Sequence, residues 1–513
     1  MRRAPSTGLM PSLHTTAQIR RAERCALAGL EPLALMYRAA HAISDACASE
    51  ARTLSPNAPI VALVGPGNNG GDALLAAVHL RGRGFNAQAL VLQPGVGGSS
   101  DAAVSLAAAR EANLPFLSSF PDAPGGQALF IDGLFGIGLS RPIDGRAAQW
   151  VTALNALASP VIAIDVPSGI NADTGAVVGD KRGVAVRARR TLTFLGDKPG
   201  LRTGPGRAHA GEVQVESLGV AADSASGTLV TEPEARMLAA PLARPSDSHK
   251  GRFGHVAIVG GSSGMRGAAL LAALGAQRSG AGKVSVGSPD GWRPDPALHP
   301  QLMALPAPAA PAGAYHAWVI GCGMGQSARA QSVLRRLMRE SDSPRVIDAD
   351  ALNLLATDAS LAAALGANSI PAILTPHPLE AARLLGITTD RVQADRVATA
   401  RRIASRFRSI VVLKGAGSVC AHPDGHWAII DSGSPSLATA GTGDVLAGVI
   451  GGLLAQGLAP ARAACLGAYV HGRAGELFEA EGPGMIGLSA GELPTWVAKV
   501  LNKLISPLSG HAT

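Results

Sequence analysis

Two α/β domains are the fold that this sequence predicts, and three observations support the prediction. The chain has 513 residues, which is too long for one ordinary domain. Short apolar runs are followed repeatedly by glycine-rich turns and then by helical segments, as in parallel sheets with helical crossovers. Between about 221 and 248 no periodic apolar pattern survives. We therefore expect a first domain at 1–225, a linker at 226–247 and a second domain at 248–513.

The composition favours an enzyme that handles small anionic molecules. Aromatic residues make up only 3% of the chain, so few rings are present to stack on bases. The net charge is +8, but the basic residues are scattered, which argues against a nucleic-acid partner. The most apolar stretch, about 445–457, is too short to span a bilayer, so no membrane partner is expected. The five cysteines lie far apart without a CxxC pair, which favours a cytoplasmic protein without zinc or disulfides.

The first domain begins with helical apolar spacing over 13–50 and continues as alternating strands and helices. Its strands are continuous apolar runs, and its later helices are rich in alanine and leucine. We expect strands at 59–64, 87–92, 128–132 and 161–165, and helices at 73–81, 99–112 and 145–157.

A glycine-rich turn, Gly65 to Asp72, separates the first strand from the helix that follows it. This order of elements binds phosphates or dinucleotides, because glycines leave backbone N–H groups uncovered at a helix N-terminus. The turn is not a G-x-G-x-x-G fingerprint and lacks the lysine of a P-loop. Its two asparagines, Asn68 and Asn69, offer carbonyl oxygens that suit a cation or a ribose.

Acids end two of the expected strands, Asp132 and Asp165, at the same edge of the inferred sheet. A single acid in this position often bonds only to its own loop. Two acids beside Asn69 and Ser168 form an oxygen-rich cluster of the kind that a hard cation prefers.

The motifs GNNGGD, IDGLFGIGLSRP and VIAIDVPSGINADTG together resemble the YjeF N-terminal domain, the NAD(P)H-hydrate epimerase, over about 13–220. The resemblance implies a Rossmann-like three-layer α/β/α fold and a potassium ion held by Asn69, Asp132 and Ser168. We assign Asp165 as the acid–base residue, helped by Lys198 in the segment TLTFLGDKPGL. The residues expected to hold the hydrated dinucleotide are Asn68, Asn69, Gly70, Gly71, Asp72, Gly136, Ile137, Gly138, Leu139, Ser140, Arg141, Pro142 and Asp165.

Two positions depart from the pattern of that family. Ala73 stands where glycine is usual, and Ala40 lies in a segment that is usually Arg-Ala-Gly. Neither change removes a ligand. The methyl group of Ala73 would tighten the pocket at the start of the helix.

The second domain repeats the alternation of strands and helices. Strands are expected to begin at His255, Lys283, Ala317, Arg345, Ala372 and Ile410. The stretch Gly441-Thr442-Gly443-Asp444 then opens a long apolar helix, whose N-terminus and glycines suit a phosphate. Asp444, in the first turn of that helix, is either a capping group or a base that takes a proton from a hydroxyl attacking phosphorus.

Three other residues of the second domain have both a structural and a functional interpretation. Lys414 ends a strand beside glycines, where a lysine is either solvated or bound to a phosphate. His377 lies between two prolines and is either part of a rigid helix cap or a ligand contact. Cys322 has no base beside it in the sequence, so we expect a small buried residue and not a nucleophile.

The strand-end acids, the LKG-x-G turn and the late G-T-G-D helix resemble the ribokinase-like superfamily. The segments DADALN, LTPHPLEAARLLG, VVLKGAGS and ATAGTGDVLAGVIGGLLAQGL are more specific and resemble the YjeF C-terminal domain, the ADP-dependent (S)-NAD(P)H-hydrate dehydratase, over about 248–505. The resemblance implies ADP and Mg²⁺ as cofactors. The expected nucleotide contacts are Lys414, Gly415, Ala416, Gly417, Ser418 and Gly443, and the expected contacts to the hydrated coenzyme are Ala269, Gly323, His377 and Asp444.

The two resemblances imply a bifunctional enzyme that repairs hydrated NADH and NADPH. The first half would interconvert the R and S hydrates, and the second would restore the double bond of the S form, with Asp444 as the base. The expected partners are these hydrates and ADP, with self-association into a homo-oligomer. Two alternatives stay open: a small-molecule kinase, which would release a stable phosphorylated product, and a first half that binds without catalysis.

Overall fold

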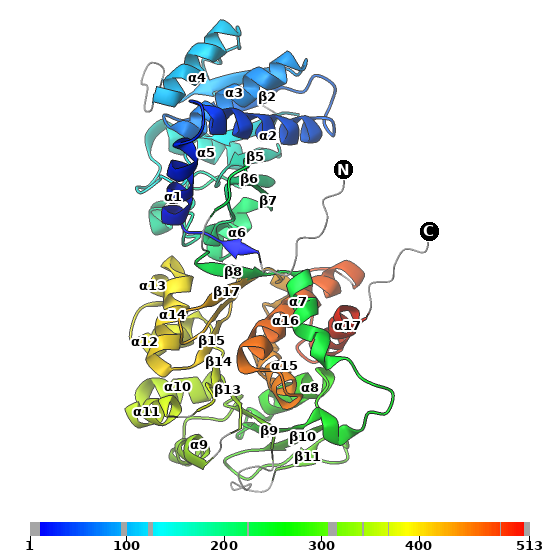
Figure 1. Cartoon of the computed structure of the whole chain (residues 1–513). Helices are drawn as coiled ribbons and strands as arrows, with labels where there is room; N and C mark the ends of the chain where they lie inside the picture. The colour runs from blue at the N-terminus through cyan, green and yellow to red at the C-terminus, as the bar shows by residue number, and fades with distance from the viewer. Residues whose placement is uncertain are drawn as a thin grey trace. The chain divides into compact units, whose positions relative to one another are not determined.

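The computed structural model describes residues 11–93, 100–121, 127–222, 225–305, 315–340, 343–367, 369–482 and 484–506. The described chain folds into two compact units (Figure 1). The N-terminal unit covers residues 12–227, and the C-terminal unit begins at residue 228. Each unit has its own sheet and its own hydrophobic core. The sheet of the N-terminal unit is parallel, whereas that of the C-terminal unit is mixed, because β16 (Val419–Ala421) is antiparallel to both β15 (Ile410–Leu413) and β17 (Trp427–Ile430).

A parallel sheet in the order β3-β2-β4-β5-β6-β7 forms the centre of the N-terminal unit. Alternate residues of β2 point to opposite faces, so Ile60 and Ala62 pack with α2 and α3, whereas Val61 and Leu63 pack with α5. The elements are β1 (Ser12–Leu13), α1 (Thr16–Leu27), α2 (Ala34–Ala51), β2 (Ile60–Val64), α3 (Asn68–Gly82), β3 (Ala87–Val91), α4 (Ser100–Glu111), β4 (Leu129–Gly133), α5 (Gly145–Ala156), β5 (Val161–Ile164), β6 (Arg190–Phe194), α6 (Gly204–Ala210) and β7 (Glu212–Glu216).

Helix α3 starts earlier than the sequence analysis predicts. The asparagines and glycines expected in a turn before residue 73 form the first turn of the helix, with Gly67 at its N-cap. Gly65 lies so close to the chain after β4 that a Cβ at this position would be 1.7 Å from the carbonyl oxygen of Leu134. This close approach, which only glycine permits, brings the start of α3 against the loop at 134–142.

The sheet of the C-terminal unit runs in the order β8-β17-β16-β15-β14-β13-β12-β9-β10-β11. Figure 1 shows α12 and α14 on the opposite side of its strands from α15 and α16. The elements are β8 (Gly227–Val230), α7 (Glu232–Ala239), β9 (His255–Val259), α8 (Arg266–Arg278), β10 (Lys283–Gly287), β11 (Met303–Ala304), β12 (Ala317–Ile320), α9 (Ala328–Glu340), β13 (Arg345–Ile347), α10 (Ala349–Thr357), α11 (Ala359–Gly366), β14 (Ile373–Leu374), α12 (Pro378–Leu385), α13 (Thr389–Ala394), α14 (Arg396–Phe407), β15 (Ile410–Leu413), β16 (Val419–Ala421), β17 (Trp427–Ile430), α15 (Thr442–Ala455), α16 (Pro460–Glu481) and α17 (Leu493–Ile505).

Helices α8 and α15 pack closely because glycines lie at their contact. A Cβ at Gly448 would be 1.9 Å from the carbonyl oxygen of Ala272, and one at Gly275 would be 2.5 Å from that of Val445. Glycine therefore allows the two backbones to touch, which fixes the position of the helix that begins with the G-T-G-D segment. None of the described helices combines the length and hydrophobicity that a bilayer crossing requires.

The expected linker at 226–247 is instead part of the folded C-terminal unit. Strand β8 pairs with β17, and α7 begins with a capping box in which Thr231 and Glu234 bond reciprocally. Ala235 and Leu238 of α7 are buried in the core of this unit. The T-x-x-E spacing was the signal for this helix, but the surrounding alanines, glycines and prolines hid its short apolar face.

Candidate active sites

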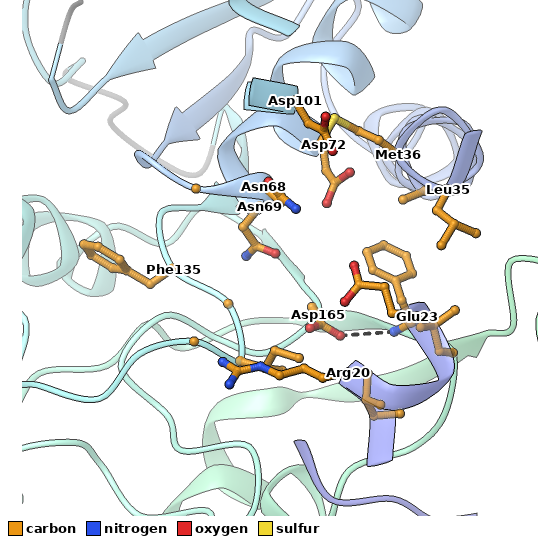
Figure 2. Close-up of a pocket in the computed structure, with 18 of the residues that line it drawn as sticks. Arg20, Glu23, Leu35, Met36, Asn68, Asn69, Asp72, Asp101, Phe135 and Asp165 are labelled. Carbon is orange, nitrogen blue, oxygen red and sulfur yellow. Dashed lines mark hydrogen bonds between the residues drawn. The ribbon is translucent and has the colours of Figure 1, made fainter. Parts of the chain in front are cut away.

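A cavity of about 470 Å³ lies at the carboxyl ends of the strands in the N-terminal unit. Ten predicted residues line it: Asn68, Asn69, Asp72, Gly136, Ile137, Gly138, Leu139, Ser140, Arg141 and Asp165. Figure 2 shows the two asparagines at the start of α3, with Asp165 on the far side of the cavity. Gly70, Gly71 and Pro142, which the sequence analysis also assigns to this site, are not among its lining residues. Gly70 and Gly71 are buried in the first turn of α3.

Asp165 and Lys198 form an ion pair at the base of the cavity. Lys198 Nζ lies 2.7 Å from Asp165 Oδ1, and the lysine side chain is fully buried. The ammonium also donates to Thr193 Oγ1 at 2.7 Å and to the carbonyl oxygen of Phe194 at 2.9 Å. Asp165 itself adopts a left-handed backbone conformation, with φ 66°, directly after β5. A non-glycine residue in this conformation is a mark of functional sites.

The second predicted acid, Asp132, lies behind the cavity and is joined to Ser168. Ser168 Oγ donates to Asp132 Oδ1 at 2.6 Å, and Ser168 N donates to Asp132 Oδ2 at 2.8 Å. Burial raises the pKa of Asp132 to about 6, against the opposing effect of these hydrogen bonds. Asn69 donates through Nδ2 to the carbonyl oxygen of Ile164 at 3.0 Å. The structure therefore brings Asp132 and Ser168 into direct contact.

The sequence analysis missed the wall of the cavity that α1, α2 and α4 provide. Helix α1 contributes Arg20 and Glu23, α2 contributes Leu35 and Met36, and α4 contributes Asp101 (Figure 2). Helical spacing located these helices, but no local pattern shows that they fold over the ends of the strands.

In the C-terminal unit, neighbouring strands bring two acids and a lysine together. Lys414 follows β15 and donates to Asp348 Oδ1, after β13, at 2.8 Å, and it lies 3.9 Å from Glu380 Oε2. Burial opposes the charge on Lys414, but the two carboxylates outweigh it and raise the pKa of the lysine. Burial, and then the charge on Asp348, raise the pKa of Glu380 to about 7, although Lys414 opposes the rise.

Asp444 lies in the first turn of α15, as the sequence predicts, but it is not the cap of that helix. The N-cap is Gly441, in a left-handed conformation with φ 91°, and no side-chain hydrogen bond caps the helix. Burial and the neighbouring charge of Asp348 raise the pKa of Asp444 to about 6, and a hydrogen bond with the Cys322 thiol opposes this rise. A Cβ at Gly443 would lie 3.3 Å from Lys414 Nζ, so the start of α15 faces the lysine.

Three other predicted residues have clear structural positions. His377 caps α12: its Nδ1 accepts from the backbone N–H groups of Leu379 at 3.1 Å and Glu380 at 3.3 Å. Cys322 is fully buried, as expected, yet its thiol contacts Asp444, which the sequence did not reveal. Gly323, with φ 58°, requires the conformational freedom of glycine beside Met265.

The assignment of Ala269 as a ligand contact stays a prediction. Ala269 is fully buried in the core, because its side of α8 faces the sheet and α15. The adjacent Ala268 is only partly buried, and a Cβ at Gly323 would lie 3.0 Å from the Ala268 methyl group. Helical geometry turns adjacent residues by about 100°, so one of two neighbouring alanines faces the site while the other faces the core.

Each unit thus holds a polar site at the carboxyl ends of parallel strands, beside glycine-rich turns and a helix N-terminus, which defines an α/β protein with two nucleotide-type sites. The NAD(P)H-hydrate dehydratase family matches residues 256–493, and the family of the YjeF-related protein N-terminus matches residues 32–200. The bifunctional NAD(P)H-hydrate repair enzyme of Coxiella burnetii is 37% identical over 501 residues, which cover 94% of this chain and 98% of the relative. The chain therefore belongs to the family of bifunctional NAD(P)H-hydrate repair enzymes.

Two other comparisons concern the C-terminal unit. The ADP-dependent (S)-NAD(P)H-hydrate dehydratase of Neisseria meningitidis is 47% identical over 256 residues, which cover 49% of this chain and 86% of the relative. One solved structure is the ADP/ATP-dependent NAD(P)H-hydrate dehydratase of Bacillus subtilis, co-crystallized with ATP/Mg²⁺, which is 32% identical in sequence. The match covers 54% of this chain and 98% of that chain, with a TM-score of 0.48.

Proposed function

We propose that the chain epimerises the R and S forms of NAD(P)H hydrate and dehydrates the S form to NAD(P)H, converting ADP to AMP and phosphate. The observation that carries this proposal is the match to a bifunctional repair enzyme along 94% of the chain. The geometry supports it, because each unit by itself holds a polar site with a candidate proton-transfer residue. We further propose that residues 1–225 carry the epimerase activity and residues 248–513 the dehydratase activity. Residues 226–247 would belong to the dehydratase domain.

In the epimerase site, Asp165 is the proposed acid–base residue. Its carboxylate faces the cavity, and the buried ammonium of Lys198, 2.7 Å away, supplies the counter-charge. Asn68, Asn69 and the loop from Gly136 to Arg141 would hold the hydrated dinucleotide, since they line the same cavity. Gly70 and Gly71 would act indirectly: Gly70 lets α3 begin against Gly65 after β2, and Gly71 leaves room for the side chains of Met36 and Ser105.

The oxygens around Asp132 fit a monovalent cation. Ser168 Oγ is within hydrogen-bond distance of both Asp132 Oδ1 and the carbonyl oxygen of Phe135, at 2.6 and 3.1 Å, but it has one proton to donate. Asp132 is fully buried, so a neighbouring positive charge would stabilise its carboxylate. Asp132 and Ser168, with the amide oxygen of Asn69, would hold potassium, which would neutralise this charge and fix the loop that carries Phe135.

This potassium proposal has a test that does not depend on activity. We expect potassium chloride to raise the thermal unfolding temperature of the full-length protein relative to tetramethylammonium chloride at equal ionic strength, because the larger cation cannot enter the site. Asp132→Asn should abolish the difference. An equal rise in the variant would show that potassium acts elsewhere.

In the dehydratase site, the difficulty is that hydroxide is a poor leaving group, so the hydroxyl is first phosphorylated. Asp444 would take the hydroxyl proton as the hydroxyl attacks the terminal phosphate of the nucleotide. Lys414 and the N-terminus of α15 at Gly443 would hold that phosphate, since the two adjoin in the structure. The loop Lys414 to Ser418 would bind the rest of the adenine nucleotide. Phosphate would then leave from the carbon bonded to the ring nitrogen, the neighbouring ring carbon would release a proton to water, and the electrons of that carbon–hydrogen bond would form the ring double bond.

The same site offers oxygens for a divalent cation. The carboxylates of Asp348 and Glu380 lie 2.8 and 3.9 Å from Lys414 Nζ, and burial raises the pKa of both Glu380 and Asp444. Among the described residues no group of three His, Cys, Asp or Glu side chains is arranged to hold a metal ion by itself. Mg²⁺ would therefore be held mainly by the phosphates of the nucleotide, whose charge it would offset, with carboxylate oxygens of the site beside it. Gly323, His377 and Ala269 would contact the hydrated coenzyme. The free cysteines of the described chain fit the proposed cytoplasmic location, and self-association stays an expectation.

A single assay tests the proposed function. The full-length protein is given a mixture of R and S hydrates with ADP and Mg²⁺, and the recovery of near-ultraviolet absorbance by reduced nicotinamide is followed. We expect complete recovery, with AMP and phosphate formed in step. Recovery of the S fraction alone would refute the epimerase assignment, and a stable phosphorylated product would identify a kinase instead. Nucleic-acid binding, if present, should vanish at moderate salt.

A further inference from the structure

Glu23 is an acid that the sequence analysis did not connect with the epimerase site. It lies on α1, lines the same cavity as Asp165 and is partly buried there (Figure 2). The start of its helix is fixed by a capping box between Thr15 and Gln18. Thr16 also donates through its backbone N and its Oγ1 to Asp173 Oδ1, at 2.6 and 3.0 Å. Asp173 belongs to the segment after β5 that begins with Asp165, so α1 is tied to the part of the chain that carries the proposed base.

We propose that Glu23 is a second catalytic residue of the epimerase site and acts as the proton-donating partner of Asp165. The inference rests on the proposed epimerase function and adds to it a distinct role for a residue that none of the recognised motifs contains. It assigns the two carboxyl groups of the cavity opposite tasks, one as base and one as acid.

The surroundings of the two acids differ in the way that this division requires. Asp165 contacts the buried ammonium of Lys198, and the backbone N–H of Phe194 donates to Asp165 Oδ1 at 3.2 Å. Asp165 is therefore paired with a cation and a backbone donor. Burial, and next the charge on Asp165, raise the pKa of Glu23, and these effects outweigh the opposing charges of Arg20, Arg24 and Lys198. An acid paired with a cation and a second acid of the same cavity whose pKa is raised can serve as base and acid in one reaction.

The chemistry of the substrate needs such a pair. The hydrated ring carries its hydroxyl on a carbon bonded to the ring nitrogen. Asp165 takes the hydroxyl proton, the oxygen–hydrogen electrons form a carbonyl, and the carbon–nitrogen bond breaks. The electrons of that bond pass to the nitrogen, which takes the proton of Glu23. Rotation then presents the other face of the aldehyde, and the reverse steps close the ring, returning a proton from nitrogen to Glu23 and one from Asp165 to the inverted hydroxyl.

Asp72 is the main competitor for this role. It also lines the cavity, and burial, Asp165, Glu23 and Asp101 raise its pKa well above the usual value. Its side chain belongs to the first turns of α3, beside the asparagines proposed to hold the dinucleotide. Asp72 is therefore assigned to binding, and a comparison of Glu23→Gln with Asp72→Asn separates the two roles.

The test uses the full-length protein, excess ADP and Mg²⁺, and a mixture of R and S hydrates. Conversion of the S form gives a fast phase from the C-terminal site, and conversion of the R form gives a slow phase limited by epimerisation. Glu23→Gln should lower kcat of the slow phase by about 100-fold or more, with KM nearly unchanged and the fast phase intact. Asp72→Asn should instead raise KM. Glu31→Gln, an exposed acid outside the cavity, is the control and should change neither phase.

The pH profile gives a second readout. In the unaltered protein the rate of the slow phase should decline as pH rises through the raised pKa of Glu23, because the proton donor ionises. The Glu23→Gln variant should not show this decline at high pH. Glu23→Asp keeps an acid at this position, so it should be faster than Glu23→Gln and should again show part of the decline at high pH. A slow phase within threefold of normal in Glu23→Gln, or a rise in KM alone, would overturn the proposal. Conversion that stops at the S fraction in the unaltered protein would instead refute the epimerase function itself.

Discussion

At the scale of single residues, the two proposed catalytic acids have different partners. Asp165 contacts the buried ammonium of Lys198 directly, at 2.7 Å. Asp444 has a thiol as hydrogen-bond partner and Asp348 as a charged neighbour, and its pKa is raised to about 6. We therefore expect the two acids to respond differently to pH and to substitution.

For Asp444, the expected effect is a loss of dehydratase activity in acid. A base must be ionised, so the rate should fall as pH decreases through about 6, the pKa of the buried carboxyl. Asp444→Asn should bind ADP normally and lose at least about 100-fold in turnover. The measurements are the rate of S-hydrate conversion against pH and the affinity for ADP by calorimetry. A near-normal rate in the variant would exclude Asp444 as the base.

For Lys198, the expected effect concerns both stability and activity. Lys198→Met removes the cation and leaves the Asp165 carboxylate with no counter-charge in direct contact, which typically costs about 3–5 kcal/mol in a buried pair. Urea denaturation should show this loss in the N-terminal unit, and epimerisation should fail. The double variant Lys198→Met/Asp165→Asn should recover part of the stability, because no charge is then buried. If the single variant were fully stable, the ion pair would not hold this site together.

At the scale of secondary-structure elements, both sites depend on where a helix begins. Helix α3 starts at Asn68, where the close approach that Gly65 permits to the chain at Leu134 sets the turn after β2. Helix α15 starts at Thr442, after the left-handed Gly441. The position of α15 depends further on α8, whose backbone it touches at Gly448. Packing far from the site thus places Asp444.

The contact between α8 and α15 should be intolerant of any side chain. Gly448→Ala would place a methyl group 1.9 Å from the carbonyl oxygen of Ala272, so the helices must separate. We expect a loss of about 1–3 kcal/mol in stability to urea, together with lower dehydratase activity. Gly267→Ala, on α8 where no atom lies within 4 Å of the new methyl, is the matched control and should be neutral or stabilising. Equal stability of the two variants would contradict this account of the packing.

At the scale of the whole molecule, each proposed site is built from residues of one unit. Among the described residues, those that line the cavity around Asp165 lie between Ile19 and Leu218, all in the N-terminal unit. Those that cluster around Lys414 lie after Ala268, all in the C-terminal unit. The two activities should therefore be separable by substitution.

The prediction is complementation in solution. Asp165→Asn should convert the S hydrate alone, and Asp444→Asn should interconvert the epimers without dehydration. A mixture of the two full-length variants should restore complete conversion of both epimers, because the hydrate released from one protein can diffuse to the other. Failure of the mixture, with each single activity intact, would show that the sites must lie in the same chain.

The sequence by itself determined the parts of the protein that depend on local patterns. The apolar runs that became β2 and β9, the glycines before α3 and α15, and the acids after the strands were all readable, because strand burial, helix starts and turns depend on neighbouring residues. These features also carried the resemblance to the repair-enzyme family. Two local predictions differed from the structure: α3 begins at Asn68 and not at residue 73, and the expected linker contains a short helix that alanine, glycine and proline had hidden.

Only the tertiary structure decided which residues meet. It brought Glu23 of α1 into the cavity of Asp165, turned Ala269 into the core in place of Ala268, and set the Cys322 thiol against Asp444. These residues are far apart in the chain or differ by one helical position, and no local periodicity encodes such contacts. They result from the way that helices pack on the sheets, where buried area and close backbone contacts such as that at Gly448 select one arrangement.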